Sequence, residues 1–309
     1  MSQEDRGLSS HLKDSLFPFN DEQPLGAGGK KTTMLLGIFS TNGKKYASRR
    51  STVRETYLSI DDPRLCKLSE YKRQVEDNPN NVVCQVPYTF VIGAGDESRP
   101  HDHDDDQPLT VETVIDGSVD AEGDCTYLNI KENMEDGKSS TYFKFGASLA
   151  KPYTIDYVAK IDDDSVLSPH LLLQLIEDDL PPAPFNRRHY GGSSWASYAK
   201  NLMYGSGQFY FMSSDLANYV GNSLSAKQRL SMMHSRHTED GDMGAFIFSH
   251  PRPVKFLNLS NHAFWHHPRK EVDEFKSTWN DSMGGLPRRG GKVLMLSFLC
   301  PAWLNGQGL

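Results

Sequence analysis

Three consecutive aspartates, Asp162, Asp163 and Asp164, are the side chains of this sequence best placed to do chemistry. They follow residues 155–161, an apolar run rich in β-branched and aromatic residues that predicts a buried strand. A little further on, Ser168-Pro169 is typical of a helix N-cap followed by proline at the first helical position. The three carboxylates therefore lie at the carboxyl end of a predicted strand, where open α/β sheets bind their ligands.

The charge of these aspartates predicts a cation beside them. Adjacent carboxylates repel one another, and a divalent metal with oxygen ligands is the simplest partner. A solvated acidic loop is the alternative, but Lys160 and Ile161 directly before the triplet indicate that it leaves a buried strand. A HAD-type phosphatase would carry Asp-x-Asp after its first strand, followed by glycine or threonine, whereas Ser165 follows here in mid-chain.

A second acidic pair, Glu239-Asp240, precedes the apolar residues 243–248. Acids in this position stabilise the start of a helix through the helix dipole. A general base that accepts a proton from a substrate hydroxyl is the other interpretation. The residues by themselves favour the helix start.

A third acidic stretch, residues 101–106, lies in a turn-rich insertion at about 96–124. It resembles a metal site at first sight. The EF-hand pattern fails, however, because Gln107 replaces the required glycine and Thr113 the final glutamate. We interpret the insertion as a solvated loop, placed where it could contact an acceptor.

The composition restricts the class of protein. A chain of 309 residues with 37% hydrophobic residues is long enough for one large α/β domain, and its formal net charge of -7 argues against binding to a nucleic acid backbone. No apolar run approaches the roughly 20 residues of a membrane helix, and the first residues lack a signal-peptide pattern. Residues 1–31 predict a flexible N-terminal tail, and residues 32–309 a single domain.

Strands and helices alternate along that domain. We expect strands at residues 34–40, 86–92, 155–161, 208–213, 254–259 and 293–299, and helices at 49–58 (capped by Ser48), 139–149, 169–176 and 214–220. This order predicts an α/β fold with a mainly parallel, doubly wound central sheet flanked by helices.

The cysteines and sequons leave the compartment open. Cys66, Cys84, Cys125 and Cys300 contain no CxxC pair, which excludes the common zinc-ribbon spacings and leaves free thiols or one to two disulfides. The triplets that begin at Asn258 and Asn280 permit N-glycosylation if the chain is secreted.

Six segments in order between about residues 35 and 247 resemble glycosyltransferase family 31, the β-1,3-galactosyltransferase and N-acetylglucosaminyltransferase type, in a divergent form. Arg49-Arg-Ser-Thr-Val-Arg-Glu-Thr-Tyr57 is similar to the family's Arg-Arg-x-x-Ile-Arg-x-Thr-Trp, with Tyr57 in place of Trp. Residues 157–164 are similar to its Asp-x-Asp strand nearly residue for residue, and residues 204–217 resemble its Tyr-x-x-Gly-x-x-Tyr-x-x-Ser-x-Asp-Leu block. Glu239-Asp240 with Gly244 resembles its Glu-Asp-Val-x-x-Gly motif, although Gly241-Asp242 departs from the usual residues. Residues 89–93 and 132–144 complete the set.

The resemblance implies a GT-A fold that binds a UDP-sugar and Mn²⁺ or Mg²⁺. Asp162 would contact the ribose or the waters of the metal, Asp163 the nucleotide-sugar, and Asp164 the metal itself. His266 or His267 would supply a further metal ligand, although a surface or packing role is equally open to each. Asp240 would be the general base of an inverting displacement, with Glu239 beside the acceptor or sugar.

Six more residues are candidate substrate contacts. Arg49, Arg50 and Arg54 would hold the uracil or the diphosphate, with a plain helix surface as the alternative. Gly205 and Gly207 would let the backbone approach the sugar or acceptor, or would only mark a turn. In addition, Trp195 could stack on a sugar ring or belong to the core.

The expected activity is that of a UDP-sugar-dependent hexosyltransferase, which moves galactose or N-acetylhexosamine to a hydroxyl of a glycan or glycoprotein, forming a β-1,3 linkage. The family works in the Golgi lumen behind a membrane anchor, and no anchor or signal is visible in this sequence. A non-catalytic sugar- or nucleotide-binding protein of the same fold and a metal-dependent phosphohydrolase are the alternatives.

Overall fold

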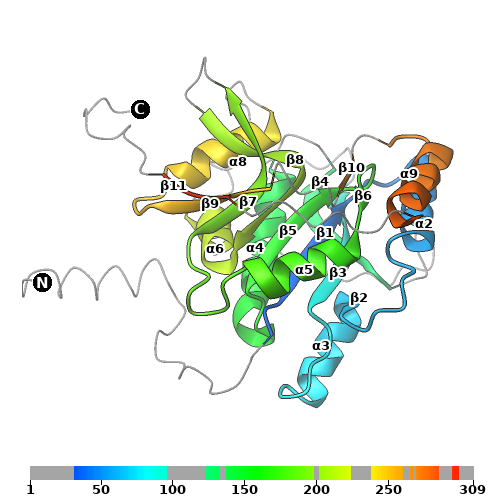
Figure 1. Cartoon of the computed structure of the whole chain (residues 1–309), viewed down its shortest axis with the longest axis horizontal. Helices are drawn as coiled ribbons and strands as arrows, with labels where there is room; N and C mark the ends of the chain where they lie inside the picture. Colours follow the sequence, from blue (N-terminus) through cyan, green and yellow to red (C-terminus); the bar gives the residue numbers. More distant parts are fainter. Residues whose placement is uncertain are drawn as a thin grey trace, which may run out of the picture.

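A computed structural model describes residues 31–95, 123–132, 137–197, 202–223, 238–259, 265–266, 269–284 and 294–298 of the chain. They form one large mixed sheet with helices on both faces (Figure 1). The predicted α/β class is thereby confirmed. The expected N-terminal tail apart from Lys31, and most of the acidic insertion, lie outside the described residues.

The central sheet has nine strands in the order β11-β9-β7-β8-β5-β1-β3-β2, with β4 paired to the second half of β3. Five neighbouring strands, β5, β1, β3, β2 and β4, pair in parallel with one another, and β7 pairs in parallel with β9. In contrast, β8 runs antiparallel to both β5 and β7, and β11 runs antiparallel to β9. The strands are β1 (Met34–Phe39), β2 (Leu65–Lys67), β3 (Val86–Gly95), β4 (Cys125–Lys131), β5 (Tyr157–Asp162), β7 (His189–Ser197), β8 (Leu202–Ser213), β9 (Val254–Asn258) and β11 (Leu294–Phe298).

The strand order reverses at β1. The chain runs from β1 to β3 on one side and returns through β5 on the other, so β1 has parallel neighbours on both sides. In open α/β sheets such a switch point leaves a crevice outside the carboxyl ends of the two strands. Here those ends are Phe39 and Asp162.

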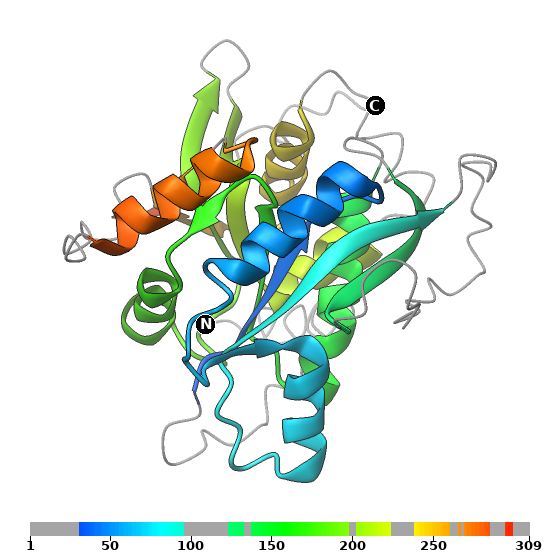
Figure 2. The ribbon, with the colours of Figure 1, turned by 90° about the vertical axis from the view of Figure 1, so that its right-hand side faces the viewer.

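Helices cover both faces of this sheet because successive side chains of a buried strand point to opposite sides. Leu36 and Ile38 pack in one core with Val53 of a helix and with Tyr57, which follows that helix. Leu35, the residue before Leu36, packs in the other core. The first face carries α2 (Lys44–Glu55), α5 (Pro169–Gln174, continued by a π-helical turn at Leu175–Asp179) and α9 (Val272–Gly284), and the second carries α3 (Leu68–Asp77), α4 (Lys138–Tyr153), α6 (Ser214–Asn222) and α8 (Glu239–Phe248). Figure 2 shows α2 and α9 side by side on the first face.

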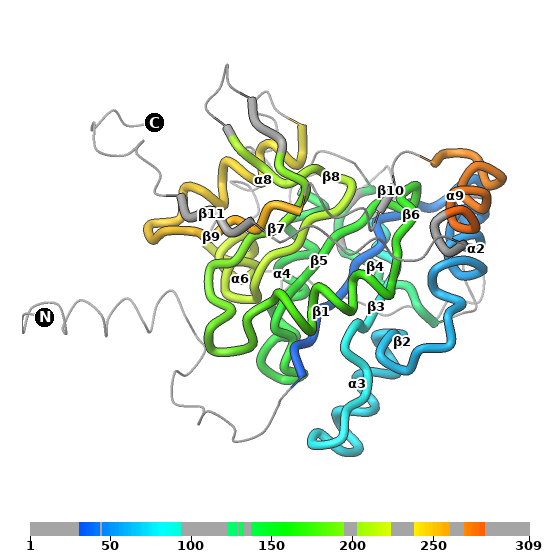
Figure 3. Tube along the Cα trace, in the orientation of Figure 1, coloured from blue at the N-terminus to red at the C-terminus, as the bar shows by residue number. Residues whose placement is uncertain are grey.

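A small second sheet lies at the carboxyl end of β5. It pairs β6 (Val166–Leu167), directly after the three aspartates, with β10 (Trp265–His266) in antiparallel register. Figure 3 traces the chain from β5 into β6. A segment about a hundred residues downstream is thereby brought to the end of β5.

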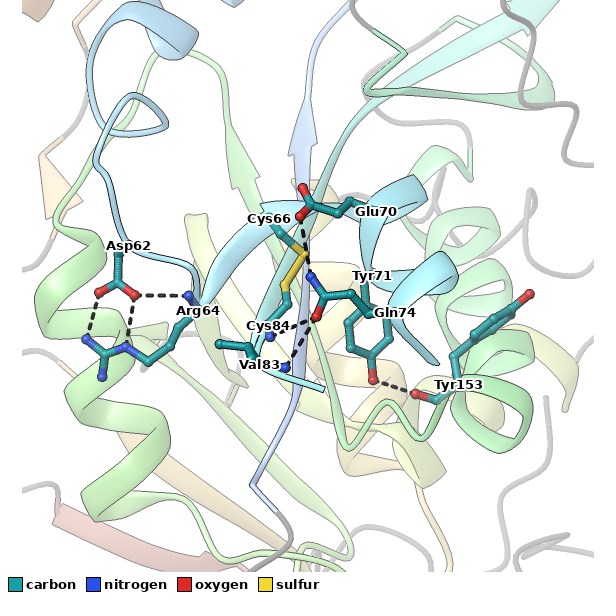
Figure 4. Close-up of a disulfide and its surroundings, with 9 residues drawn as sticks. All are labelled: Asp62, Arg64, Cys66, Glu70, Tyr71, Gln74, Val83, Cys84 and Tyr153. Carbon is teal, nitrogen blue, oxygen red and sulfur yellow. Dashed lines mark hydrogen bonds and ion pairs between the residues drawn. A yellow bond between two sulfur atoms is a disulfide. The ribbon is translucent and has the colours of Figure 1, made fainter. Parts of the chain in front are cut away.

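One disulfide joins Cys66 of β2 to Cys84, just before β3 (Figure 4). Gln74 of α3 supports the same loop, since its Oε1 accepts the backbone N–H groups of Val83 and Cys84 at 3.3 and 3.4 Å. The hydroxyl of Tyr71 donates to the carbonyl of Tyr153 at 2.6 Å and ties α3 to α4. These contacts lie at the amino end of β3, away from the carboxyl edge.

Most predicted elements are present, and one predicted cap is wrong. The first helix begins at Lys44, not Arg49, because Gly43 adopts a φ of 121° and serves as its N-cap. Ser48 lies inside that helix and does not cap it. Ser168 does precede α5 with proline at the start, but its side chain makes no capping hydrogen bond. None of the helices in the described part of the chain is long and apolar enough to cross a membrane.

Candidate functional site

The candidate site lies where β5 ends and α8 begins. Asp162 is the last residue of β5, and Glu239 is the first of α8, which packs beside β8. β8 pairs with β5. The two acidic motifs singled out in the sequence therefore belong to neighbouring elements of the fold.

A single ammonium group connects these motifs. Nζ of Lys160 lies 3.2 Å from Oδ1 of Asp162 and 3.1 Å from Oε2 of Glu239. It also donates to the carbonyl of Gly207 on β8 at 3.0 Å. Lys160 is buried, and its Nζ lies over the rings of Phe39 and Tyr210 at 5.2 and 5.6 Å from their centroids. The sequence prediction included no role for this lysine.

The charges of this cluster are coupled. Burial by itself lowers the pKa of Lys160, but the carboxylates of Asp162 and Glu239 outweigh it, so the net shift is upward. Burial, with the charges of Glu239 and Asp164, raises the pKa of Asp162 to about 6 in spite of the attraction of Lys160. The cluster holds more carboxylates than cations, which favours binding of a further cation.

Asp163 faces different partners from Asp162. Its Oδ2 accepts the hydroxyl of Ser40 at 2.7 Å, and its Oδ1 pairs with Arg49 at 3.2 Å. Arg50 is fully buried and donates to the Ser40 hydroxyl at 3.0 Å and to the Thr41 carbonyl at 2.6 Å. Asp163 thus fastens the end of β5 to β1 and α2. Its contact with a nucleotide stays a prediction.

The third aspartate is held next to the histidine segment. The carbonyl of Asp164 accepts the backbone N–H of Arg269 at 2.8 Å, and His266 of β10 pairs with Val166. The backbone of His266 therefore lies beside the acidic turn, as the prediction of a histidine ligand requires. The side chain of His266 and the whole of His267 lie outside what the structure describes.

Asp240 is engaged at the start of α8. Its Oδ1 accepts the hydroxyl of Thr238 and the N–H of Gly241, the latter at 2.9 Å, and its Oδ2 accepts the N–H of Gly207 at 2.8 Å. The carboxylate is half-buried. The helix-start interpretation is thus supported by direct contacts, and the role as general base stays a prediction.

Gly207 approaches Asp240 closely. A Cβ on this glycine would lie 3.3 Å from Oδ2 of Asp240, so the missing side chain lets β8 and α8 meet. The N–H of Gly205 donates to the hydroxyl of Tyr190 at 2.8 Å. Trp195 lies in β7 opposite Tyr204, and its side chain is not among those described.

Arg54 is engaged with Asp124 at the start of β4. Its Nε and Nη2 bind both oxygens of Asp124 at 2.9 and 2.8 Å, and its guanidinium lies 4.7 Å from the centroid of the Phe90 ring. The Asp124 side chain is fully buried. This bidentate pair links α2 to β4, and the predicted contact of Arg54 with a nucleotide remains a prediction.

A second buried lysine, Lys138, also lies against the Phe39 ring. Nζ of Lys138 donates to the Ser40 carbonyl at 2.6 Å and to Glu132 at 2.7 Å, and it lies 5.3 Å from the centroid of the Phe39 ring. The other oxygen of Glu132 accepts the N–H of Gly93 at 2.7 Å. Sequence reasoning singled out the segment that contains both residues but assigned neither a role.

The donor set of the site fits a hard divalent cation. Within the described ranges, no three His, Cys, Asp or Glu side chains are grouped so as to hold a metal ion. Mg²⁺ is nevertheless commonly held by one or two protein carboxylates together with substrate phosphates and water, and Mn²⁺ prefers the same oxygen ligands. Asp162, with its side chain 29% exposed, and Asp164 two residues further on provide such a pair.

Comparison with known proteins identifies no relative of this chain among family models or curated proteins. The likeness to glycosyltransferase family 31 therefore rests on the six sequence motifs alone.

Proposed function

We propose that this protein is an inverting, metal-dependent hexosyltransferase that moves galactose or N-acetylhexosamine from a UDP-sugar to a hydroxyl of a glycan acceptor, with a β-1,3 linkage as the expected product. One observation carries the proposal. The acidic end of β5 and the acidic start of α8 share the ammonium of Lys160 at the switch point of the sheet. The donor-binding acids and the general base would therefore face one crevice.

In this proposal, metal binding and proton transfer are assigned to different side chains. Asp162 and Asp164 would hold Mn²⁺ or Mg²⁺, with His266 or His267 as a further ligand. When bound, the metal supplies positive charge against the diphosphate. A carboxylate offers about four lone-pair sites, so Asp240 can accept a substrate hydroxyl in addition to its present partners. It would take the hydroxyl proton while the oxygen bonds to the anomeric carbon and the bond to UDP breaks, with inversion.

The disulfide supports the proposed compartment. Disulfides persist in oxidising environments and are rare in the cytosol. The Cys66–Cys84 bridge therefore favours the lumen of the secretory pathway, in agreement with the proposed Golgi location.

The test is release of UDP by the full chain with Mn²⁺, a panel of UDP-sugars and a panel of glycan acceptors. We expect UDP release that depends on both metal and acceptor. Asp240→Asn should lower kcat by about 10²- to 10⁴-fold, as expected for loss of a general base, and Asp164→Asn should weaken binding of the metal and UDP.

The same assay separates the alternatives. A non-catalytic binding protein would bind UDP with Mn²⁺ and release nothing. A phosphohydrolase would release phosphate without an acceptor. Either result would replace the transferase proposal.

A further inference from the structure

Lys160 has no role as a ligand, acid or base in the proposed reaction, yet it makes several buried contacts. Its side chain is 7% exposed, and it reaches three elements at once: β5 through Asp162, α8 through Glu239 and β8 through the Gly207 carbonyl. Glu239 in turn receives the hydroxyl of the buried Tyr210 at 2.7 Å. The cluster is therefore a connected, buried network.

We propose that Lys160 is a positioning residue, which holds the end of β5 and the start of α8 together so that the acids of both face one crevice. This inference rests on the proposed function for what the crevice binds. The connection between β5 and α8 through Lys160 does not depend on the proposed function.

The contacts of Lys160 show why it would stay in place when a ligand binds. Asp162 is the more exposed of its two carboxylate partners, at 29%, whereas Glu239 is 12% exposed. A cation that approaches Asp162 from the crevice leaves the contacts with Glu239, Gly207 and the two aromatic rings intact. The ammonium can then keep α8 on β8 while Asp162 turns to its ligand.

Other cations near the triplet have different partners. Arg49 pairs with Asp163, Lys138 pairs with Glu132, and Arg50 donates to the Ser40 hydroxyl and the Thr41 carbonyl. None of these contacts includes a residue of α8. Among the described ion pairs, Lys160 is thus the cation that connects the aspartate triplet to α8.

The variants must separate positioning from charge balance. Lys160→Met keeps the length of the side chain but leaves Glu239 and Asp162 without their counter-charge, and breaking a buried pair this way can prevent folding. Lys160→Met combined with Glu239→Gln removes the cation and one buried anion together, and Glu239→Gln alone is its reference. Arg64→Met is the matched control, since Arg64 also bridges two carboxylates, Asp62 and Glu177, but at the surface.

The first measurement is amide hydrogen exchange of residues 162–165 and 239–244 in the full chain. We expect the double variant to exchange about tenfold faster than Glu239→Gln in both segments, because the link that closes local openings is lost. Arg64→Met should leave both segments unchanged. Exchange in the double variant equal to that of Glu239→Gln would overturn the proposal.

The second measurement is binding of UDP in the presence of Mn²⁺. We expect the double variant to regain thermal stability relative to Lys160→Met but to bind UDP about tenfold or more weakly than Glu239→Gln, as is usual when the support of a metal ligand is lost. Lys160→Arg should restore part of the affinity. Faster exchange with unchanged UDP affinity would reduce Lys160 to a packing role.

These outcomes are distinguishable from failure of the proposed function. If the wild-type protein binds neither UDP nor Mn²⁺, the transferase proposal fails. Hydrogen exchange still decides whether Lys160 holds β5 to α8.

Discussion

Asp163 differs from its neighbours in having both carboxylate oxygens bound by the protein. Ser40 and Arg49 supply those contacts, and the Asp163 side chain is buried. We predict that Asp163→Asn lowers the free energy of unfolding by about 3 kcal/mol, since it leaves Arg49 without its buried partner. Urea unfolding measures this loss.

Asp162→Asn is the matched comparison for this variant. It should change stability less and should weaken binding of UDP with Mn²⁺ more. If Asp163→Asn folds as stably as the wild-type protein and instead loses UDP binding, Asp163 contacts the nucleotide and does not stabilise the fold.

Sequence reasoning located the acids of the site but not their cations. The triplet was visible because three aspartates end an apolar run, and its repulsion predicted a metal. The protein supplies part of the missing charge itself, through Lys160 and Arg49. Lys160 could have been found, because residues two apart in a strand share a face and Asp162 is two residues on. Its meeting with Glu239 depends on how α8 packs, which no local pattern encodes.

At the scale of elements, the packing of α8 on β8 depends on Gly244. A Cβ there would lie 2.3 Å from Cβ of Tyr204 and 3.0 Å from the carbonyl oxygen of Met203. Helix propensity favours alanine over glycine by about 1 kcal/mol, but this overlap involves backbone and forces α8 away from β8. We predict that Gly244→Ala destabilises the protein by about 1–3 kcal/mol, typical of overpacking.

The displacement of α8 should also affect the site. Asp240 and Glu239 move with the helix, whereas Asp162 and Asp164 do not, so kcat should fall more than the affinity for UDP. Thermal unfolding and steady-state kinetics measure the two effects. Ala245→Ser, at an exposed position of the same helix, is the control. A stabilised Gly244→Ala would contradict the packing of α8 on β8.

The disulfide serves β2 and α3, not the site. It closes a loop with a sequence separation of 18 at the amino end of β3, opposite the carboxyl edge. We predict that Cys66→Ser with Cys84→Ser lowers the free energy of unfolding by about 3 kcal/mol, as for loops of this length. UDP binding should not change.

A reductant provides the control for the disulfide. It should lower the unfolding midpoint of the wild-type protein toward that of the double serine variant and leave the variant unaffected. If reductant does not change the unfolding midpoint of the wild-type protein, and this midpoint equals that of the variant, the disulfide contributes nothing to stability.

The strands that sequence reasoning found are those with continuous apolar runs, such as β1, β5 and β9. It missed β7, whose residues His189–Ser197 contain glycine and serine in place of an apolar pattern. Those small residues make room for a neighbour: a Cβ on Gly191 would lie 2.3 Å from Cζ of Phe211. The apolar side chain is thus supplied by the adjacent strand β8. In contrast, α9 carries Val272, Phe275 and Trp279 at helical spacing and was missed despite its pattern.

At the scale of the whole molecule, binding of metal and nucleotide should be coupled. In the proposed function, Asp162 and Asp164 would supply two carboxylates to a metal, and without a metal the diphosphate of UDP would face an acidic cluster. We predict that neither Mn²⁺ nor UDP alone raises the unfolding midpoint appreciably. Together, at about 100 times the dissociation constant, they should stabilise the fold by about 2.7 kcal/mol.

Differential scanning calorimetry measures this coupling. Asp164→Asn should abolish the joint effect, and Asp163→Asn should keep it despite a lower starting midpoint. Stabilisation by UDP alone, equal with and without metal, would show that the nucleotide site needs no cation.

The free energy of unfolding should depend on pH through a buried histidine that is not part of the candidate site. His189 at the start of β7 is fully buried. Burial lowers the pKa of His189, and Lys255 adds to that effect against the opposing charge of Asp215. The unfolded chain therefore binds a proton at a pH where the folded protein does not, so stability falls as pH drops below about 6.5.

The total slope does not isolate this effect, because Asp162 acts in the opposite direction. Its pKa in the fold is about 6, above the ordinary value, so its contribution to stability falls as pH rises from about 4 to 6.

The difference between the wild-type protein and His189→Gln does isolate the effect of His189. We predict that between pH 6.5 and 5 the wild-type protein loses up to about 1.4 kcal/mol per pH unit more than the variant. Urea unfolding across this range measures it, with the exposed His170→Gln as control. Parallel pH profiles for wild type and His189→Gln would mean that His189 takes up its proton as readily in the fold as in the unfolded chain, against what its burial requires.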